Sequence, residues 1–151
     1  MEPNNRKSFL ELKVIWKDDD MIELKITASN LDFRGITEVY DQSECLSEFA
    51  NLLTHFPNEN NTLFYEMGEK DSYAYFSMKF YSIDSDSHKG VEINIESNVP
   101  TEYRKEEKNK MKIEIIVEPS AIDNFQRELQ YLVKNEEGTA LLFGKDNWLD
   151  N

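Results

Sequence analysis

The chain has few residues whose type and spacing could do chemistry, and the clearest group is Asp84, Asp86 and His88. These residues have the spacing of the first, third and fifth ligands of a calcium-binding loop. The sixth position of such a loop requires glycine and the twelfth a bidentate glutamate, whereas this sequence has Lys89 and Ile95 there. We therefore predict a turn between two strands that binds no metal. A small hydrolase or metal protein that uses these three residues is an alternative.

A nucleophilic cysteine would need a histidine beside it, and the sequence offers only Cys45 with His55 or His88. Cys45 and His55 lie ten residues apart in a predicted helix, about 15 Å along its axis, so they cannot pair. The five glycines never cluster, so no phosphate-binding loop is predicted. Among 30 acidic residues no pair stands out as a general acid and base. We expect a protein that is not an enzyme, with no catalytic residues and no cofactor.

The charge of the chain says more about its partners. Its 151 residues include 30 Asp and Glu against 17 Lys and Arg, a formal net charge of −13. This charge repels the phosphate backbone of nucleic acids and favours a basic protein partner. The single cysteine permits no intramolecular disulfide, and no apolar run approaches the roughly 18 residues that a membrane span needs. We therefore expect a cytoplasmic protein with no membrane partner, in which residues 1–151 form one domain.

Alternating apolar and polar residues predict that much of the chain forms β-strands. The first such segment has Leu10, Leu12, Val14 and Trp16 on its apolar side, and a second follows the acidic turn 18–20. Together they predict a β-hairpin. The predicted strands are 10–17, 22–28, 36–40, 63–67, 73–83, 90–97 and 111–118, and the tail through 138–143 could add another.

Two amphipathic helices are predicted between these strands. The first has Ser43 as its expected N-cap and ends before Pro57. Its apolar stripe is Leu46, Phe49, Leu53 and Phe56. The second helix begins at Pro119, and its stripe is Ile122, Phe125, Leu129 and Leu132. Each residue of the second stripe lies 76 positions after its counterpart in the first, which either a degenerate internal repeat or two helices of similar build would explain.

Strands that alternate apolar with polar residues leave one face of a sheet in water, so two helices can cover only the other face. The predicted fold class is therefore α+β, a mostly antiparallel β-sheet with two amphipathic helices packed on one face. The wet face gathers tyrosines and carboxylates, an arrangement that suits a basic partner but is equally typical of a solvated face with cross-strand packing. Its candidate partner-binding residues are Tyr73, Tyr75, Tyr81, Glu92, Asn94, Glu96 and Glu114.

The order of strands and helices resembles that of a family of bacterial immunity proteins. One half of the pattern is residues 33–40 (FRGITEVY) followed by the first helical stripe. The other half is residues 90–95 (GVEINI) and 113–118 (IEIIVE) followed by the second stripe. Over residues 8–133 the chain is similar to the WapI-type immunity family, small acidic proteins paired with contact-dependent toxins. The tail 136–151 lies outside the pattern.

The resemblance implies a protein that binds a basic toxin domain in the cytoplasm of the producing cell and occludes it. It carries over no catalytic residues. The alternative function is a structural or regulatory interaction module, a homodimer that forms through an exposed sheet edge.

Overall fold

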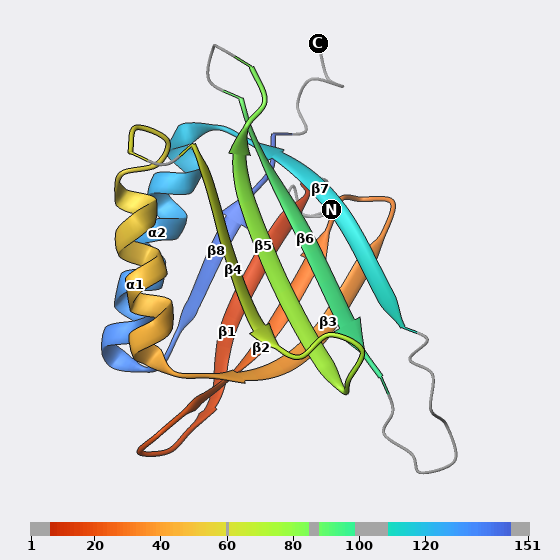
Figure 1. Ribbon diagram of the computed structural model, residues 1–151, viewed down its shortest axis with the longest axis vertical. Helices are drawn as coiled ribbons and strands as arrows, with labels where there is room; N and C mark the ends of the chain where they lie inside the picture. The colour runs from red at the N-terminus through yellow and green to blue at the C-terminus, as the bar shows by residue number, and fades with distance from the viewer. Residues whose placement is uncertain (1–6, 60, 85–87, 99–108, 146–151) are drawn as a thin grey trace.

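The computed structural model describes residues 7–59, 61–84, 88–98 and 109–145. Within these residues the chain forms eight strands and two helices (Figure 1). In chain order they are β1 (Phe9–Lys17), β2 (Ile22–Ser29), β3 (Arg34–Asp41), α1 (Ser43–Thr54), β4 (Thr62–Gly68), β5 (Ala74–Ser82), β6 (Lys89–Ser97), β7 (Lys110–Val117), α2 (Pro119–Asn135) and β8 (Thr139–Phe143).

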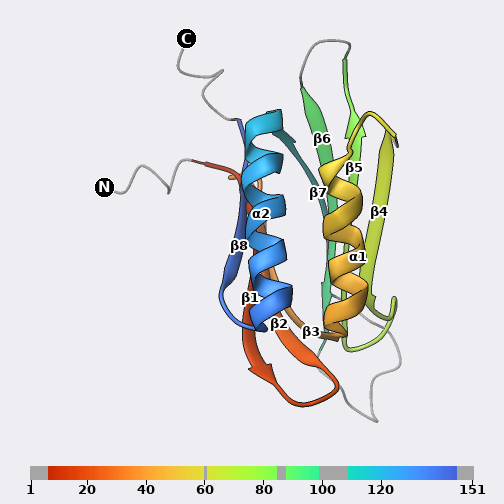
Figure 2. The ribbon, with the colours of Figure 1, turned by 90° about the vertical axis from the view of Figure 1, so that its left-hand side faces the viewer.

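The strands form two antiparallel sheets of four strands, in the orders β3-β2-β1-β8 and β4-β5-β6-β7. Figure 2 shows the sheets facing each other, with both helices along one open side. A buried hydrogen bond joins the sheets, in which the Thr37 hydroxyl donates to the Glu96 carbonyl at 2.8 Å. The α+β class is therefore confirmed. The strands divide into two sheets rather than one because each apolar face covers the other, and the helices close only the remaining gap.

The two halves of the chain follow the same plan. Each consists of three antiparallel strands, a helix and a fourth strand, and the fourth strand pairs with the first strand of the other half. Thus β4 pairs with β5, and β8 pairs with β1. The spacing of 76 residues holds for the starts of β3 and β7, at Arg34 and Lys110, and of α1 and α2, at Ser43 and Pro119. The internal repeat is confirmed as a repeat of topology, with the fourth strands exchanged between the halves.

The predicted helical stripes are confirmed as core. Leu46, Phe49 and Leu53 of α1 are buried, as are all four stripe residues of α2. Ser43 is the first residue of α1, whose N-cap is Gln42. Phe56 comes after the last turn of α1 and makes an edge contact with Phe80, with 6.2 Å between ring centroids. Apolar packing against both sheets therefore decides where the helices lie.

One strand departs from its predicted alternation. The register between β1 and β2 runs from Val14–Leu24 directly to Trp16–Glu23, so Ile15 is the extra residue of a β-bulge. Beyond a bulge the side chains change faces. The prediction that Trp16 lies on the apolar side of the strand is therefore wrong, because the bulge turns it outward beside Glu23, where it is 47% exposed.

Two candidate binding faces

Each sheet has an outer face that points away from the core. On the sheet of β4 to β7 we call this surface the tyrosine–acid face. Its polar side chains include Glu66, Tyr75, Ser77, Lys79, Tyr81, Glu92, Asn94, Glu96, Lys112 and Glu114, and it also carries the exposed apolar residues Phe64 and Ile116. Six of the seven predicted partner-binding residues lie on it, so their assignment to one face is confirmed. The seventh, Tyr73, precedes β5 and is 65% exposed.

Two of the predicted residues on this face are buried. Tyr75 is 1% exposed and Glu96 is 8% exposed. The turn after β4 covers them, because the Lys70 ammonium lies 5.8 Å from the centroid of the Tyr75 ring and the Asp71 amide donates to Glu96 at 2.7 Å. The expectation that these two side chains are open to a partner is therefore wrong. Alternation in the sequence predicts on which face of the sheet a residue lies, but it does not predict that a turn covers this residue.

The tyrosines of this face have partners within the sheet. The Tyr75 hydroxyl donates to Glu66 at 2.7 Å, and burial together with that carboxylate raises the pKa of Tyr75 to about 12. The Tyr81 hydroxyl donates to Glu114, and burial followed by this hydrogen bond raises the pKa of Tyr81 as well. Both phenols are thus fixed as neutral donors to carboxylates of their own sheet.

Gly90 makes the second of these contacts possible. It is the register partner of Tyr81, and a Cβ at Gly90 would come within 2.4 Å of the tyrosine ring. The ring therefore lies across β6 and reaches Glu114 on β7. Asn94 donates to the Ser77 hydroxyl at 3.1 Å, and Lys112 pairs with Glu92 at 3.6 Å. The two tyrosines and several other polar residues of this face thus have partners on neighbouring strands, whereas Phe64 of β4 keeps 51% of its surface in solvent.

The outer face of the other sheet presents aromatic rings to solvent. Trp16, Glu23 and Tyr40 form one register row across β1, β2 and β3, and we call them the Trp16 row. The two rings meet edge to face with centroids 6.0 Å apart, and Tyr40 is 52% exposed. Regular alternation in the first strand does not predict this row, because it places Trp16 on the apolar side. Alternation in β3 does predict that Tyr40 points outward, because the preceding residue, Val39, is apolar. The structure has Val39 buried and Tyr40 exposed.

Some of the acidic residues lie at the end of the molecule that holds the turn between β1 and β2. Figures 1 and 2 place the turn between β1 and β2, the start of α1 and the end of α2 at the same end of the molecule. The Ser43 hydroxyl of α1 donates to Glu136, just after α2, at 2.6 Å. Between Arg34 and Lys70 the sequence contains no lysine or arginine. We call this the acidic stretch, and its acids are Glu38, Asp41, Glu44, Glu48, Glu59, Glu66 and Glu69.

The acidic stretch also surrounds Cys45, an exposed residue of α1. Desolvation raises the pKa of its thiol, and the nearby carboxylates of Asp41 and Glu48 raise it further. A nucleophilic cysteine requires a lowered pKa, because the thiolate is the reactive form. The surroundings of Cys45 therefore oppose such a role.

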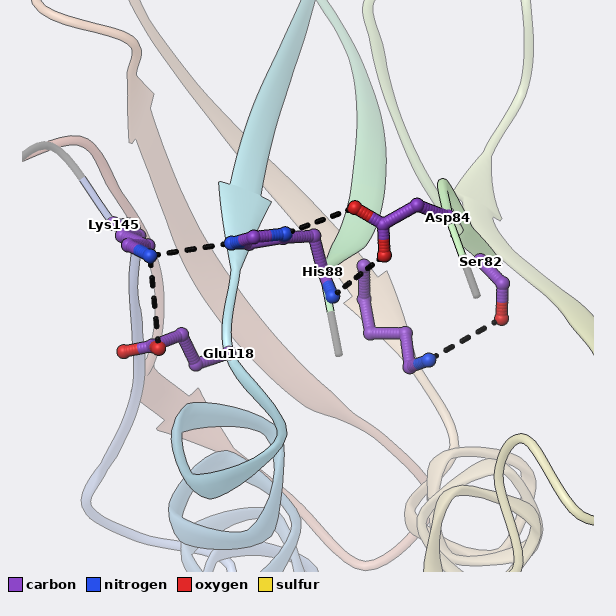
Figure 3. Close-up of polar contacts among 6 residues, drawn as sticks. Ser82, Asp84, His88, Glu118 and Lys145 are labelled. Atoms are coloured by element: carbon purple, nitrogen blue, oxygen red, sulfur yellow. Dashed lines mark hydrogen bonds and ion pairs between the residues drawn. The ribbon is translucent and has the colours of Figure 1, made fainter. Parts of the chain in front are cut away.

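The group around His88 is a chain of polar contacts, shown in Figure 3. Asp84 accepts from the Nδ1 side of His88 at 3.0 Å, while Nε2 lies 3.2 Å from the Lys145 ammonium, which also approaches Glu118 at 3.9 Å. Nδ1 thus faces the Asp84 carboxylate, and Nε2 faces an ammonium group, which can only donate. Both ring nitrogens thus have protein partners. Asp86, the third residue of the predicted turn, lies outside the described residues.

In the part of the chain that the structure describes, no group of three or more histidine, cysteine, aspartate or glutamate side chains could hold a metal ion. No helix among the same residues has the length and apolar character to cross a membrane. Comparison of the chain with protein-family models, with curated proteins and with solved structures gives no match.

Proposed function

We propose that this protein is a non-enzymatic acidic binding protein that captures a basic protein, and that its partner is a toxin domain which it neutralises by occlusion. The observation that carries the proposal is the acidic stretch, seven acids without a lysine or arginine, along β3, α1 and β4. Glu38 faces Lys25 on the neighbouring strand, but acids outnumber cations over the stretch, and such an excess produces a field that speeds association with a cationic protein.

Exposed aromatic residues beside these acids support the same proposal. Trp16 and Tyr40 are each about half exposed, and aromatic residues are enriched in the centres of protein interfaces. The identity of the partner as a toxin rests on the resemblance of residues 8–133 to the WapI-type immunity family. A protein that occludes an enzyme needs surface and charge but no catalytic group.

The test is binding to the basic C-terminal domain of the protein encoded directly upstream. Association rates are measured by stopped-flow mixing at low and physiological salt, since screening weakens such steering. The charge-reversal variant Glu44→Lys/Glu48→Lys should slow association about tenfold or more. The matched control is Asp32→Lys/Asp123→Lys, which makes the same change in net charge at exposed acids outside the stretch and should have a smaller effect.

Two outcomes would contradict the proposal. One is an upstream domain whose toxic activity persists in the presence of excess protein. The other is a tight homodimer in sedimentation that buries the acidic stretch, which would favour the alternative of a structural or regulatory interaction module.

A further inference from the structure

We infer that the Trp16 row is an anchor for an arginine side chain of the basic partner. The inference rests on the proposed function and adds the contact that would hold that partner in place. It starts from the position of Glu23, which is the register partner of both Trp16 and Tyr40. A carboxylate thus lies in line with two solvent-exposed rings, on the outer surface of one sheet.

The chemistry of the row fits a guanidinium group. Because the two rings meet edge to face at 86°, they do not stack on each other, and the ring that presents its edge keeps its own faces free of the other ring. A guanidinium is planar, so it can lie on an aromatic face and at the same time donate two parallel hydrogen bonds to a carboxylate. The ammonium group of lysine carries the same charge but cannot do both, so arginine is the preferred ligand.

The charges on the two sides of the Trp16 row differ. In the next outward-facing row, Lys13 lies directly opposite Lys25, and Glu38 follows on β3. Two facing lysines repel a further cation. On the other side of Trp16 lies the acidic turn 18–20, in which Asp18 accepts from the Asp20 and Met21 amides at 2.9 and 2.8 Å. All three aspartates of this turn are exposed.

Lys17 does not compete for Glu23. It pairs with the core residue Ile22 and therefore points to the opposite side of the sheet. The bulge at Ile15 is thus what creates the anchor, because regular alternation would exchange the faces of Trp16 and its neighbour.

Trp, Tyr and Arg are also the residues most enriched where binding energy concentrates in protein interfaces.

The experiment uses the full chain with Trp148→Phe, so that Trp16 is the one remaining tryptophan. The probes are hexa-arginine and hexalysine peptides, titrated at low salt while Trp16 fluorescence is recorded. We expect hexa-arginine to change the emission and to bind more tightly than hexalysine. Glu23→Gln and Tyr40→Ala should each weaken hexa-arginine binding about two- to fivefold.

A matched pair of variants on the tyrosine–acid face serves as the control. Glu114→Gln and Tyr81→Ala remove the same kinds of group from a tyrosine–carboxylate contact on the other sheet, and should leave the affinity for hexa-arginine unchanged. Circular dichroism of all four variants verifies that they fold.

Equal affinity for both peptides, with no effect of Glu23→Gln or Tyr40→Ala, would overturn the anchor while leaving the proposed function in place. Emission that changes with protein concentration alone, together with a dimer in sedimentation, would assign the row to a second copy of the chain and also overturn it. Failure of the upstream domain to bind, with the arginine preference intact, would instead contradict the proposed function.

Discussion

The two outer faces both have tyrosines and glutamates on antiparallel strands. They differ in whether the tyrosine hydroxyls donate hydrogen bonds to carboxylates of their own sheet. On the tyrosine–acid face, Tyr75 and Tyr81 donate to carboxylates of their own sheet. In the Trp16 row, Tyr40 and Trp16 contact each other and keep about half of their surface in solvent. Composition alone therefore does not identify a binding face, because the available surface depends on which polar groups already have partners.

The difference has a local cause on each side. The turn between β4 and β5 folds back over Tyr75, since Lys70 and Asp71 both contact the face. The turn between β1 and β2 instead extends from the sheet, and the bulge before it rotates Trp16 outward. The turn between β4 and β5 thus covers part of one outer face, whereas the bulge before the turn between β1 and β2 exposes Trp16 on the other.

The largest expected effect that tests this comparison is on stability. Tyr75→Ala should lower the free energy of unfolding by about 3 kcal/mol, because it removes a buried ring and leaves Glu66 without its donor. Tyr40→Ala should lower it by less than about 1 kcal/mol, because that ring is exposed. Urea denaturation measures both. Equal losses for the two variants would show that the faces do not differ in burial.

Gly90→Ala should cost about 1–3 kcal/mol, because the added methyl group occupies the place of the Tyr81 ring. In the Tyr81→Ala background the same change should be nearly neutral, since the ring is gone. A double-mutant cycle by urea denaturation gives the coupling between the two sites. If the two losses in the free energy of unfolding are additive, Gly90 does not act by making room for the Tyr81 ring.

A pH titration sharpens the comparison further. The phenol of Tyr75 has its pKa raised to about 12, from about 10 in an unfolded chain. As the pH rises, the unfolded state therefore releases this proton before the folded state does. The contribution of the Tyr75 phenol to the free energy of unfolding is thus complete below about pH 10 and is lost as the pH rises toward 12. Tyr75→Phe should flatten the decline in stability over this window. Absorbance at alkaline pH, which follows phenolate formation, should lose a late-titrating group in the same variant.

The smallest expected effect is that of Glu23→Gln on stability. Glu23 lies half-buried on an outer face, and glutamine keeps the size of its side chain and an oxygen acceptor, so the free energy of unfolding should change by no more than about 0.5 kcal/mol. The same variant should still weaken peptide binding. A large loss of stability would make Glu23 a structural residue and remove it from the binding surface.

Several elements could be predicted from the sequence because they depend on local pattern. The stripes of α1 and α2 and the hairpin of β1 and β2 follow from periodicity. The division into two sheets could not be predicted in this way, because it depends on which distant strands pair. The bulge at Ile15 and the cover over Tyr75 are likewise results of tertiary structure. These two features decide which face is open, so the exposed residues of the two outer faces are the least predictable part.

The exchange of fourth strands has a consequence for how the protein is made. Phe9 of β1 pairs with Phe143 of β8, so one side of the first strand stays unpaired until nearly the whole described chain has left the ribosome. At ordinary rates of synthesis that interval is of order ten seconds. An unpaired strand edge is a template for pairing with other chains. Chains that are being synthesised on the same messenger RNA can therefore associate through the unpaired edge of β1. Pairing of β8 with that edge ends this possibility.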